Sequence, residues 1–143
     1  MEKVTRAQLI DRLENSWRPF VARFYCLALQ AQQAYLSKQG YAAFPDLLAH
    51  VIAWWRDGVN VIAELRQDPS LALPDYDVDV FNAAAVQKFK LMGKDEVIQA
   101  YEAQRQAMVD LVKALPEAEL NYGNVNLRLY YEILMHWTEH EPS

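Results

Sequence analysis

The sequence predicts an all-α protein, a four-helix bundle. Apolar residues recur at helical spacing over long segments, beginning with Leu9, Leu13 and Trp17. No alternating apolar and polar run of strand length occurs in the sequence. Of the 143 residues 52% are apolar, and the few glycines (4) and prolines (6) are typical of a compact globular chain. One domain spanning residues 1–143 has an ordinary size and can bury a core without disulfides.

The first helical segment opens at Thr5, and its apolar stripe runs to Ala31. The Thr5 side chain can cap the free N–H groups, and Gln8 can reach back to complete the cap. Pro19 removes a hydrogen-bond donor and crowds the carbonyl four residues earlier, so we expect a kink or break near residues 16–18. Cys26 is the only cysteine. Its apolar neighbours favour a buried structural thiol over a nucleophile.

The second helix is expected from Pro45 to about Arg66. Proline suits the first helical position, and an acidic residue next to it favours the positive end of the helix dipole. Gly58 either weakens this helix slightly or lets a neighbouring helix or ligand approach closely. The polar, proline-containing connection over residues 67–77 is long enough for a crossover.

The remaining chain predicts further helices. A shorter helix over 78–91 is followed by a long one from Lys94 to about Ala114. Residues 116–120 form a turn or a short helical piece, residues 121–124 form a loop, and a final helix covers about 125–140. Four main helices around one core result.

Charge excludes several classes of partner. The formal net charge is −5 and no basic stripe is present, so electrostatic binding to nucleic acid or to an anionic membrane lacks its usual driving force. The longest apolar stretch, 47–55, is too short to span a bilayer. The polar start has no signal-peptide pattern, and with the single thiol this predicts a cytoplasmic protein.

The chain contains three histidines, His50, His136 and His140. The last two are four residues apart on one helix, which stacks both imidazoles on one face where they can grip one metal ion. His50 lies on the mostly apolar face of the second helix and is expected to point inward. Three protein ligands with one open position are typical of a reactive metal site. Asp57 and Glu132 lie at helical spacing from the histidines and are candidates for orienting an imidazole, for a fourth ligand or for a catalytic base.

Structural roles for these histidines stay open. A single histidine on an apolar face is usually a core residue with satisfied N–H groups, and one near a helix C-terminus complements the dipole. Trp54-Trp55 and Tyr130-Tyr131 favour the core or a dimer interface, and could instead line a pocket beside the histidines. The competing interpretation is therefore a non-catalytic helical binding or dimerisation module.

The segment GYAAFPDLLAHVIAW, residues 40–54, resembles the second-helix signature of the DinB/YfiT-like superfamily. The spacing from His50 to His136 and on to His140 is similar to the histidine triad of that superfamily. Residues 81–89 and the helix around Gln104 resemble the middle of its ClbS/DfsB and maleylpyruvate-isomerase-like branches. The resemblance covers most of the chain, from about residue 5 to residue 140.

The resemblance implies an up-down-down-up four-helix bundle, often dimeric, with a long link between its second and third helices. It also implies zinc or nickel held by His50, His136 and His140. Characterised members include thiol-dependent transferases and isomerases, and a hydrolase. We therefore expect a metal-dependent transferase or hydrolase, in which the metal activates water or a low-molecular-weight thiol for attack on a small electrophile.

The C-terminus departs from the superfamily pattern. More helix commonly follows the last histidine there, whereas only Glu141, Pro142 and Ser143 follow His140. Proline disfavours helix at the residue before it, and chain ends fray. The sequence therefore predicts a loosely held His140.

Overall fold

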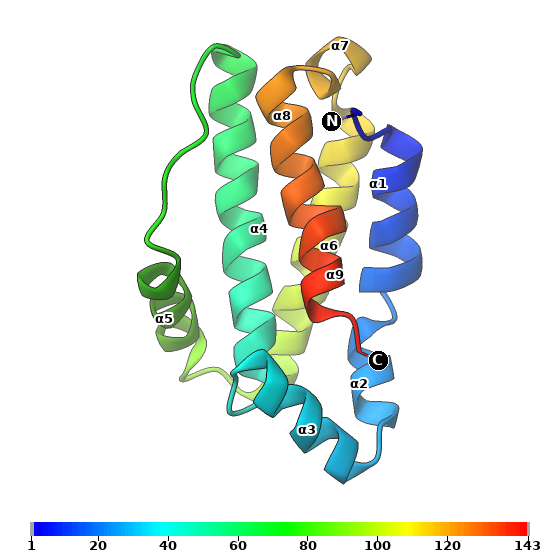
Figure 1. Cartoon of the computed structure of the whole chain (residues 1–143), viewed down its shortest axis with the longest axis vertical. Coiled ribbons are helices and arrows are strands. Elements are labelled where there is room, and N and C mark those ends of the chain that lie inside the picture. The colour runs from blue at the N-terminus through cyan, green and yellow to red at the C-terminus, as the bar shows by residue number, and fades with distance from the viewer. Residues whose placement is uncertain (1, 143) are drawn as a thin grey trace.

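The computed structural model describes residues 2–142, and within that range the chain is all-helical with no β-strand (Figure 1). This confirms the prediction that the protein is all-α. In chain order the elements are α1 (Arg6–Arg12), the π-helical turn η1 (Leu13–Trp17), α2 (Phe20–Cys26), α3 (Leu29–Gln39), α4 (Phe44–Gln67), α5 (Val78–Phe89), α6 (Lys94–Ala114), α7 (Glu117–Leu120), α8 (Gly123–Leu129), the π-helical turn η2 (Tyr130–Met135) and α9 (His136–His140).

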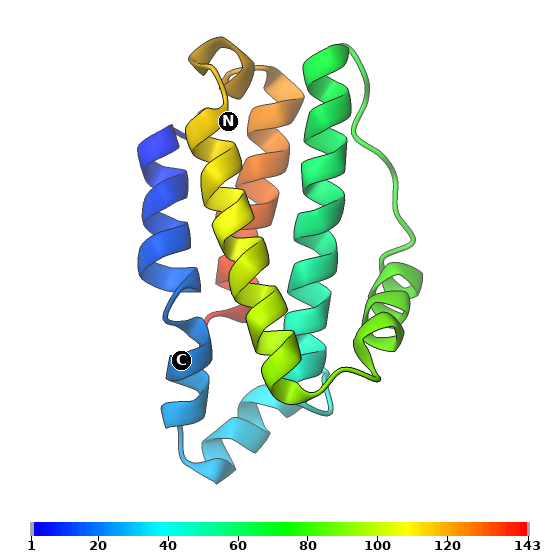
Figure 2. The same cartoon turned by 180° about the vertical axis from the view of Figure 1, so that it is seen from behind.

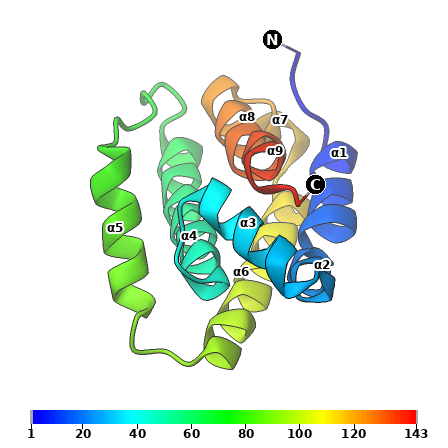
Figure 3. The same ribbon diagram turned by 60° about the horizontal axis from the view of Figure 1, so that its bottom comes forward.

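The two longest helices, α4 and α6, pack against each other, and α4 also contacts α8 and η2. Helix α1 closes the core by packing on α6 and η2. Seen from behind, α6 crosses between α1 and α4 (Figure 2). Seen from below, α5 lies outside against α4, and α3 crosses the end of the molecule (Figure 3).

The first segment breaks twice. Thr5 and Gln8 form the predicted capping box. After η1 the helix is interrupted by a turn at Arg18 and Pro19, as expected. A second break at Leu27 and Ala28, both with extended backbone, was not predicted, and no proline or glycine signals it. The prediction for Cys26 was wrong, because it is the last residue of α2 and its side chain is exposed.

One cluster of buried hydrophobic residues forms the core, and tryptophans dominate its centre. The ring of Trp17 lies 4.9 Å from that of Trp55 and 5.0 Å from that of Trp137, in edge-to-face contacts. The indole N–H of Trp17 donates to the carbonyl of Ile133 (2.9 Å), and that of Trp55 donates to the carbonyl of Glu132 (3.0 Å). Both carbonyls belong to η2, so the core holds the π turn that immediately precedes His136.

The C-terminal helical run, α8 through α9, carries its two histidines toward α4.

No helix among residues 2–142 is both long and apolar enough to cross a membrane.

Candidate metal centre

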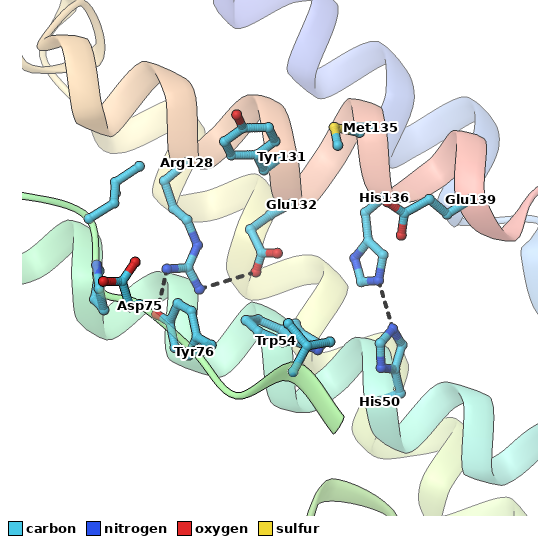
Figure 4. A pocket seen from close by; sticks show the side chains of 13 residues that line it. His50, Trp54, Asp75, Tyr76, Arg128, Tyr131, Glu132, Met135, His136 and Glu139 are labelled. Carbon is cyan, nitrogen blue, oxygen red and sulfur yellow. Dashed lines mark hydrogen bonds and ion pairs between the residues drawn. The ribbon is translucent and has the colours of Figure 1, made fainter. Parts of the chain in front are cut away.

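Three imidazoles meet inside the molecule. His50 comes from α4, and His136 and His140 come from α9. Their exposed fractions are only 7%, 5% and 6%. The Nε2 atom of His50 lies 3.1 Å from Nε2 of His136 and 3.2 Å from Nε2 of His140. Figure 4 shows His50 and His136 facing each other across the gap between α4 and α9. The tertiary structure thus brings together all three predicted ligands.

The proton on His50 can be placed from its neighbours. Asn82, on α5, puts Oδ1 2.8 Å from Nδ1 of His50 and 2.8 Å from Nε1 of Trp54. An indole N–H only donates, so the Asn82 atom that it meets is the carbonyl oxygen. Nδ1 of His50 therefore also donates to this oxygen. In the neutral ring this leaves a lone pair on Nε2, directed at the other two histidines.

The same reasoning applies to His140. The amide nitrogen of Gln39, on α3, donates to the carbonyl of Glu139 (3.0 Å), which only accepts. The Gln39 oxygen therefore faces Nδ1 of His140, 2.7 Å away, and accepts a hydrogen bond from its N–H group. Nε2 of His140 is then also an unprotonated acceptor.

The prediction that His140 is loosely held was wrong. The Tyr35 hydroxyl donates to the carbonyl of His140, and Arg23 Nη2 donates to the carbonyl of Pro142 (2.9 Å). Together with Gln39, side chains of α2 and α3 tie down the last turn. The expectation considered only the chain end and not the helices that cover it.

His136 is the most enclosed of the three histidines. Its ring packs edge-on against Trp17, with centroids 5.6 Å apart, and its Nδ1 is buried without a hydrogen-bond partner in the described chain. Burial, with a contribution from the two neighbouring imidazoles, holds the pKa of His136 well below its usual range. Burial also lowers the pKa of His50, and lowers that of His140 to about 3. All three rings are therefore neutral at pH 7.

This arrangement suits a cation. The unprotonated Nε2 atoms of His50 and His140 face each other at 3.2 Å with no proton to share. Two nitrogens bound tetrahedrally to one zinc ion at about 2.0–2.1 Å lie roughly 3.3 Å apart, close to this separation. The three histidines therefore fit a divalent metal in both chemistry and spacing.

A cavity of about 430 Å³ opens beside His50 and His136. Its apolar wall includes Trp54, Leu73, Pro74, Tyr76, Val78, Tyr131 and Met135. Of the two predicted aromatic pairs, one member of each, Trp54 and Tyr131, lines this cavity. The other members, Trp55 and Tyr130, pack in or against the core. Residues 73–76 belong to the connection between α4 and α5, which therefore forms one side of the cavity.

Glu132 lines the same cavity, one turn before His136. A methyl group on Gly58 of α4 would lie 3.1 Å from Oε2 of Glu132, so the glycine allows the close approach that the sequence suggested. Arg128 Nη2 lies 3.6 Å from the same oxygen. Burial raises the pKa of Glu132 to about 8, against the opposing effect of Arg128.

Asp57 lies outside this cavity and contacts none of the imidazoles through a hydrogen bond in the described chain. Its carboxylate accepts from Arg128 Nη2 (2.9 Å) and from the Tyr76 hydroxyl. The hydroxyl of Tyr76 in turn accepts from Arg128 Nη1 (2.8 Å). Asp57 therefore positions Arg128, which holds Glu132.

Sequence reasoning did not identify Gln39, Asn82, Tyr76 or Arg128. Only Arg128 carried a usable signal, since it lies four residues before Glu132 and eight before His136 on one helical run. The other three come from α3, α5 and the connection between α4 and α5, and their distance from the histidines in sequence conceals the contacts.

Comparison of the chain with protein-family models, with curated proteins and with solved structures finds no match.

Proposed function

We propose that His50, His136 and His140 hold a divalent metal ion, zinc or nickel, in a metal-dependent transferase or hydrolase that acts on a small electrophile. The observation that carries this proposal is the facing pair of unprotonated nitrogens on His50 and His140, 3.2 Å apart. Two buried acceptors at that distance repel each other, and a cation bound between them removes this repulsion.

A divalent ion in this position supplies Lewis-acid activation, which lowers the pKa of a water or of a low-molecular-weight thiol. Asn82 and Gln39 hold the rings of His50 and His140 with their Nε2 atoms directed inward, as outer partners of metal-bound histidines do elsewhere. These contacts also keep the two ligands neutral and unprotonated at Nε2.

The cavity supplies the remaining functions. Trp54 and its apolar neighbours exclude water and bind the body of a small molecule. Glu132 retains a proton on its carboxyl group near pH 7, because burial raises its pKa to about 8. A group with such a pKa can donate or accept a proton beside the substrate. Asp57 and Arg128 keep this carboxyl in place.

The wider expectations belong to the same proposal. The chain would be an up-down-down-up four-helix bundle of the DinB/YfiT-like superfamily that works in the cytoplasm, often as a homodimer. Its packed helices, its long connection between α4 and α5 and its histidine cluster support this view. Light scattering of the purified protein tests the dimer.

Elemental analysis of protein purified without a histidine tag tests the metal. We expect about one zinc or nickel per chain in the wild type and in Gln33→Ala, a control on the exposed face of α3. His50→Ala should lose the metal. Equal traces in all three proteins, unchanged after zinc or nickel is added, would refute the metal site.

Turnover tests the activity. A small aromatic electrophile such as chlorodinitrobenzene is incubated with cysteine, glutathione or cysteamine, before and after chelation. Conjugation that saturates with substrate and stops on chelation supports the proposed enzyme. Ligand binding that survives chelation without any turnover supports the binding module instead.

A further inference from the structure

The cavity beside the histidines has more acidic than basic side chains. Asp75, Glu132 and Glu139 line it, and Arg128 is the one lysine or arginine side chain among its described lining residues. Figure 4 shows Asp75 at the Arg128 end, Glu139 at the His136 end, and Glu132 between them. The acidic groups are thus distributed along the cavity.

Arg128 is not free to bind an anion. Its guanidinium donates to Asp57 (2.9 Å) and to the Tyr76 hydroxyl (2.8 Å), and it also lies 3.6 Å from Glu132. The Asp57 carboxylate, just outside the cavity, already balances its charge. A carboxylate or phosphate on a ligand would therefore find no uncommitted cationic side chain here.

One carboxyl oxygen of Glu132 lacks a hydrogen-bond partner. The residue is only 5% exposed, and its buried Oε2 atom has no hydrogen-bond partner in the described chain. Arg128 is too far away, at 3.6 Å, for more than an ion pair. Without a ligand, burial raises the pKa of Glu132 and keeps it protonated near pH 7. A buried oxygen without a partner is costly, so a ligand that brings an N–H group to Glu132 gains from satisfying it, and a positive charge on that group favours the ionised carboxylate.

The rest of the wall suits an apolar body. Trp54, Val78, Tyr131 and Met135 line the cavity, and the side chains of Val78, Tyr131 and Met135 are partly exposed. Aromatic rings also attract a cation placed over their faces. The volume of about 430 Å³ lies in the range of small-molecule sites.

We propose that this cavity binds a small apolar molecule that carries a protonated amine, with the ammonium group beside Glu132. The inference rests on the proposed function in one respect, since it takes this cavity as the substrate site. The reacting end of the molecule would face the histidines. A divalent ion there repels the ammonium, so the amine belongs on the Asp75 side of Glu132, about 6 Å or more along the helix from His136.

A matched set of probes tests this inference. 3-Phenylpropylamine, 3-phenylpropanol and 3-phenylpropanoate share one body and differ in charge. Their binding at pH 7 is measured by calorimetry with the chelated protein and with the zinc-loaded protein. We expect the amine to bind about tenfold more tightly than the alcohol, and the carboxylate to bind more weakly than the alcohol, in both forms.

Substitutions of the acidic lining residues show which of them attracts the amine. Glu132→Gln should remove most of the preference for the amine. Asp75→Asn and Glu139→Gln alter exposed side chains and should each reduce it by about 2- to 5-fold. Glu64→Gln, an exposed residue of α4 outside the cavity lining, should change nothing.

Three results would overturn the inference. These are carboxylate binding as tight as amine binding, an amine preference that survives Glu132→Gln, and no binding of any probe at millimolar concentration. Metal content is measured on the same samples. An amine preference in a chain that binds no metal would refute the proposed function alone, and a metal-binding chain without the preference would refute this inference alone.

Discussion

Asn82 shows how a single amide can decide what a histidine does. Its oxygen accepts hydrogen bonds from both His50 and Trp54, at 2.8 Å each, and thereby links a candidate metal ligand to a residue of the cavity wall. Because the indole can only donate, the direction of both hydrogen bonds is determined. The neutral imidazole that results has its lone pair directed at His136 and His140.

Removing this oxygen should weaken metal binding. We expect Asn82→Ala to lower zinc affinity by about 10- to 100-fold, because the His50 ring loses the partner that orients it. Asn82→Asp keeps the acceptor and should bind zinc at least as well as the wild type. Competition with a chelator measures both affinities. Asn60→Ala, an exposed change on α4, is the control, and an unchanged affinity in Asn82→Ala would contradict the assigned role.

Glu132 should make stability depend on pH. Its pKa is raised to about 8 in the folded protein by burial, so folding favours the protonated form. The resulting stabilisation is complete below the usual carboxyl pKa and is lost as the pH rises through 8.

The measurement compares metal-free wild type with Glu132→Gln by urea unfolding from pH 4 to 9. Relative to the variant, the wild type should lose about 1 kcal/mol per pH unit between pH 5 and 8 and then level off. The histidines contribute equally to both proteins and cancel. A constant difference across this range would show that Glu132 is ionised in the folded state.

At the scale of elements, side chains of α3 hold α9 in place through hydrogen bonds. Tyr35 and Gln39 both reach the last turn, where they bind the backbone of Glu139 and His140 and the imidazole of His140. The chain end is held from outside its own helix. No residue of α3 is fully buried, and of its side chains only Tyr35 and Leu36 pack against the core, so its contacts with the site are mainly polar.

Removing the hydrogen bonds between α3 and α9 should make the last turn of α9 more mobile. In Gln39→Ala, the backbone amides of α9 should exchange with solvent faster, by about fivefold for a lost hydrogen bond of roughly 1 kcal/mol. Zinc affinity should fall in parallel. Hydrogen exchange followed by NMR measures the first effect, with Gln33→Ala as the control on the same helix. Unchanged exchange in α9 would mean that its own helical bonds suffice.

At the scale of the whole molecule, the histidines join two parts of the fold that are far apart in sequence. His50 belongs to α4, and His136 and His140 belong to the end of the chain. The core joins the same two parts, because Trp17 packs against both Trp55 of α4 and Trp137 of α9. An ion that binds these ligands only in the folded chain must stabilise the whole fold.

Zinc at about 100 times its dissociation constant should raise the free energy of unfolding by about 2.7 kcal/mol. Thermal unfolding with and without the metal measures this gain as a rise in melting temperature. His50→Gln should show no rise while keeping its metal-free stability close to that of the wild type. An equal rise in both proteins would locate the zinc elsewhere.

The sequence by itself determined the helices. Local signals predicted most helix boundaries to within a few residues, because they act directly on the nearby backbone. These signals are the apolar periodicity, the Thr5 cap, Pro19 and Pro45. The sequence also identified Glu132, His136 and His140, since residues of one helix separated by four positions share a face, and His50 from the apolar face of its own helix.

Only the tertiary structure decided what surrounds the histidines. Gln39 and Asn82 come from α3 and α5, whose positions depend on the break at Leu27 and Ala28 and on the path of the connection before α5. The burial of His140 and the exposure of Cys26 were settled in the same way. Such contacts depend on packing between distant segments, which local propensity does not encode.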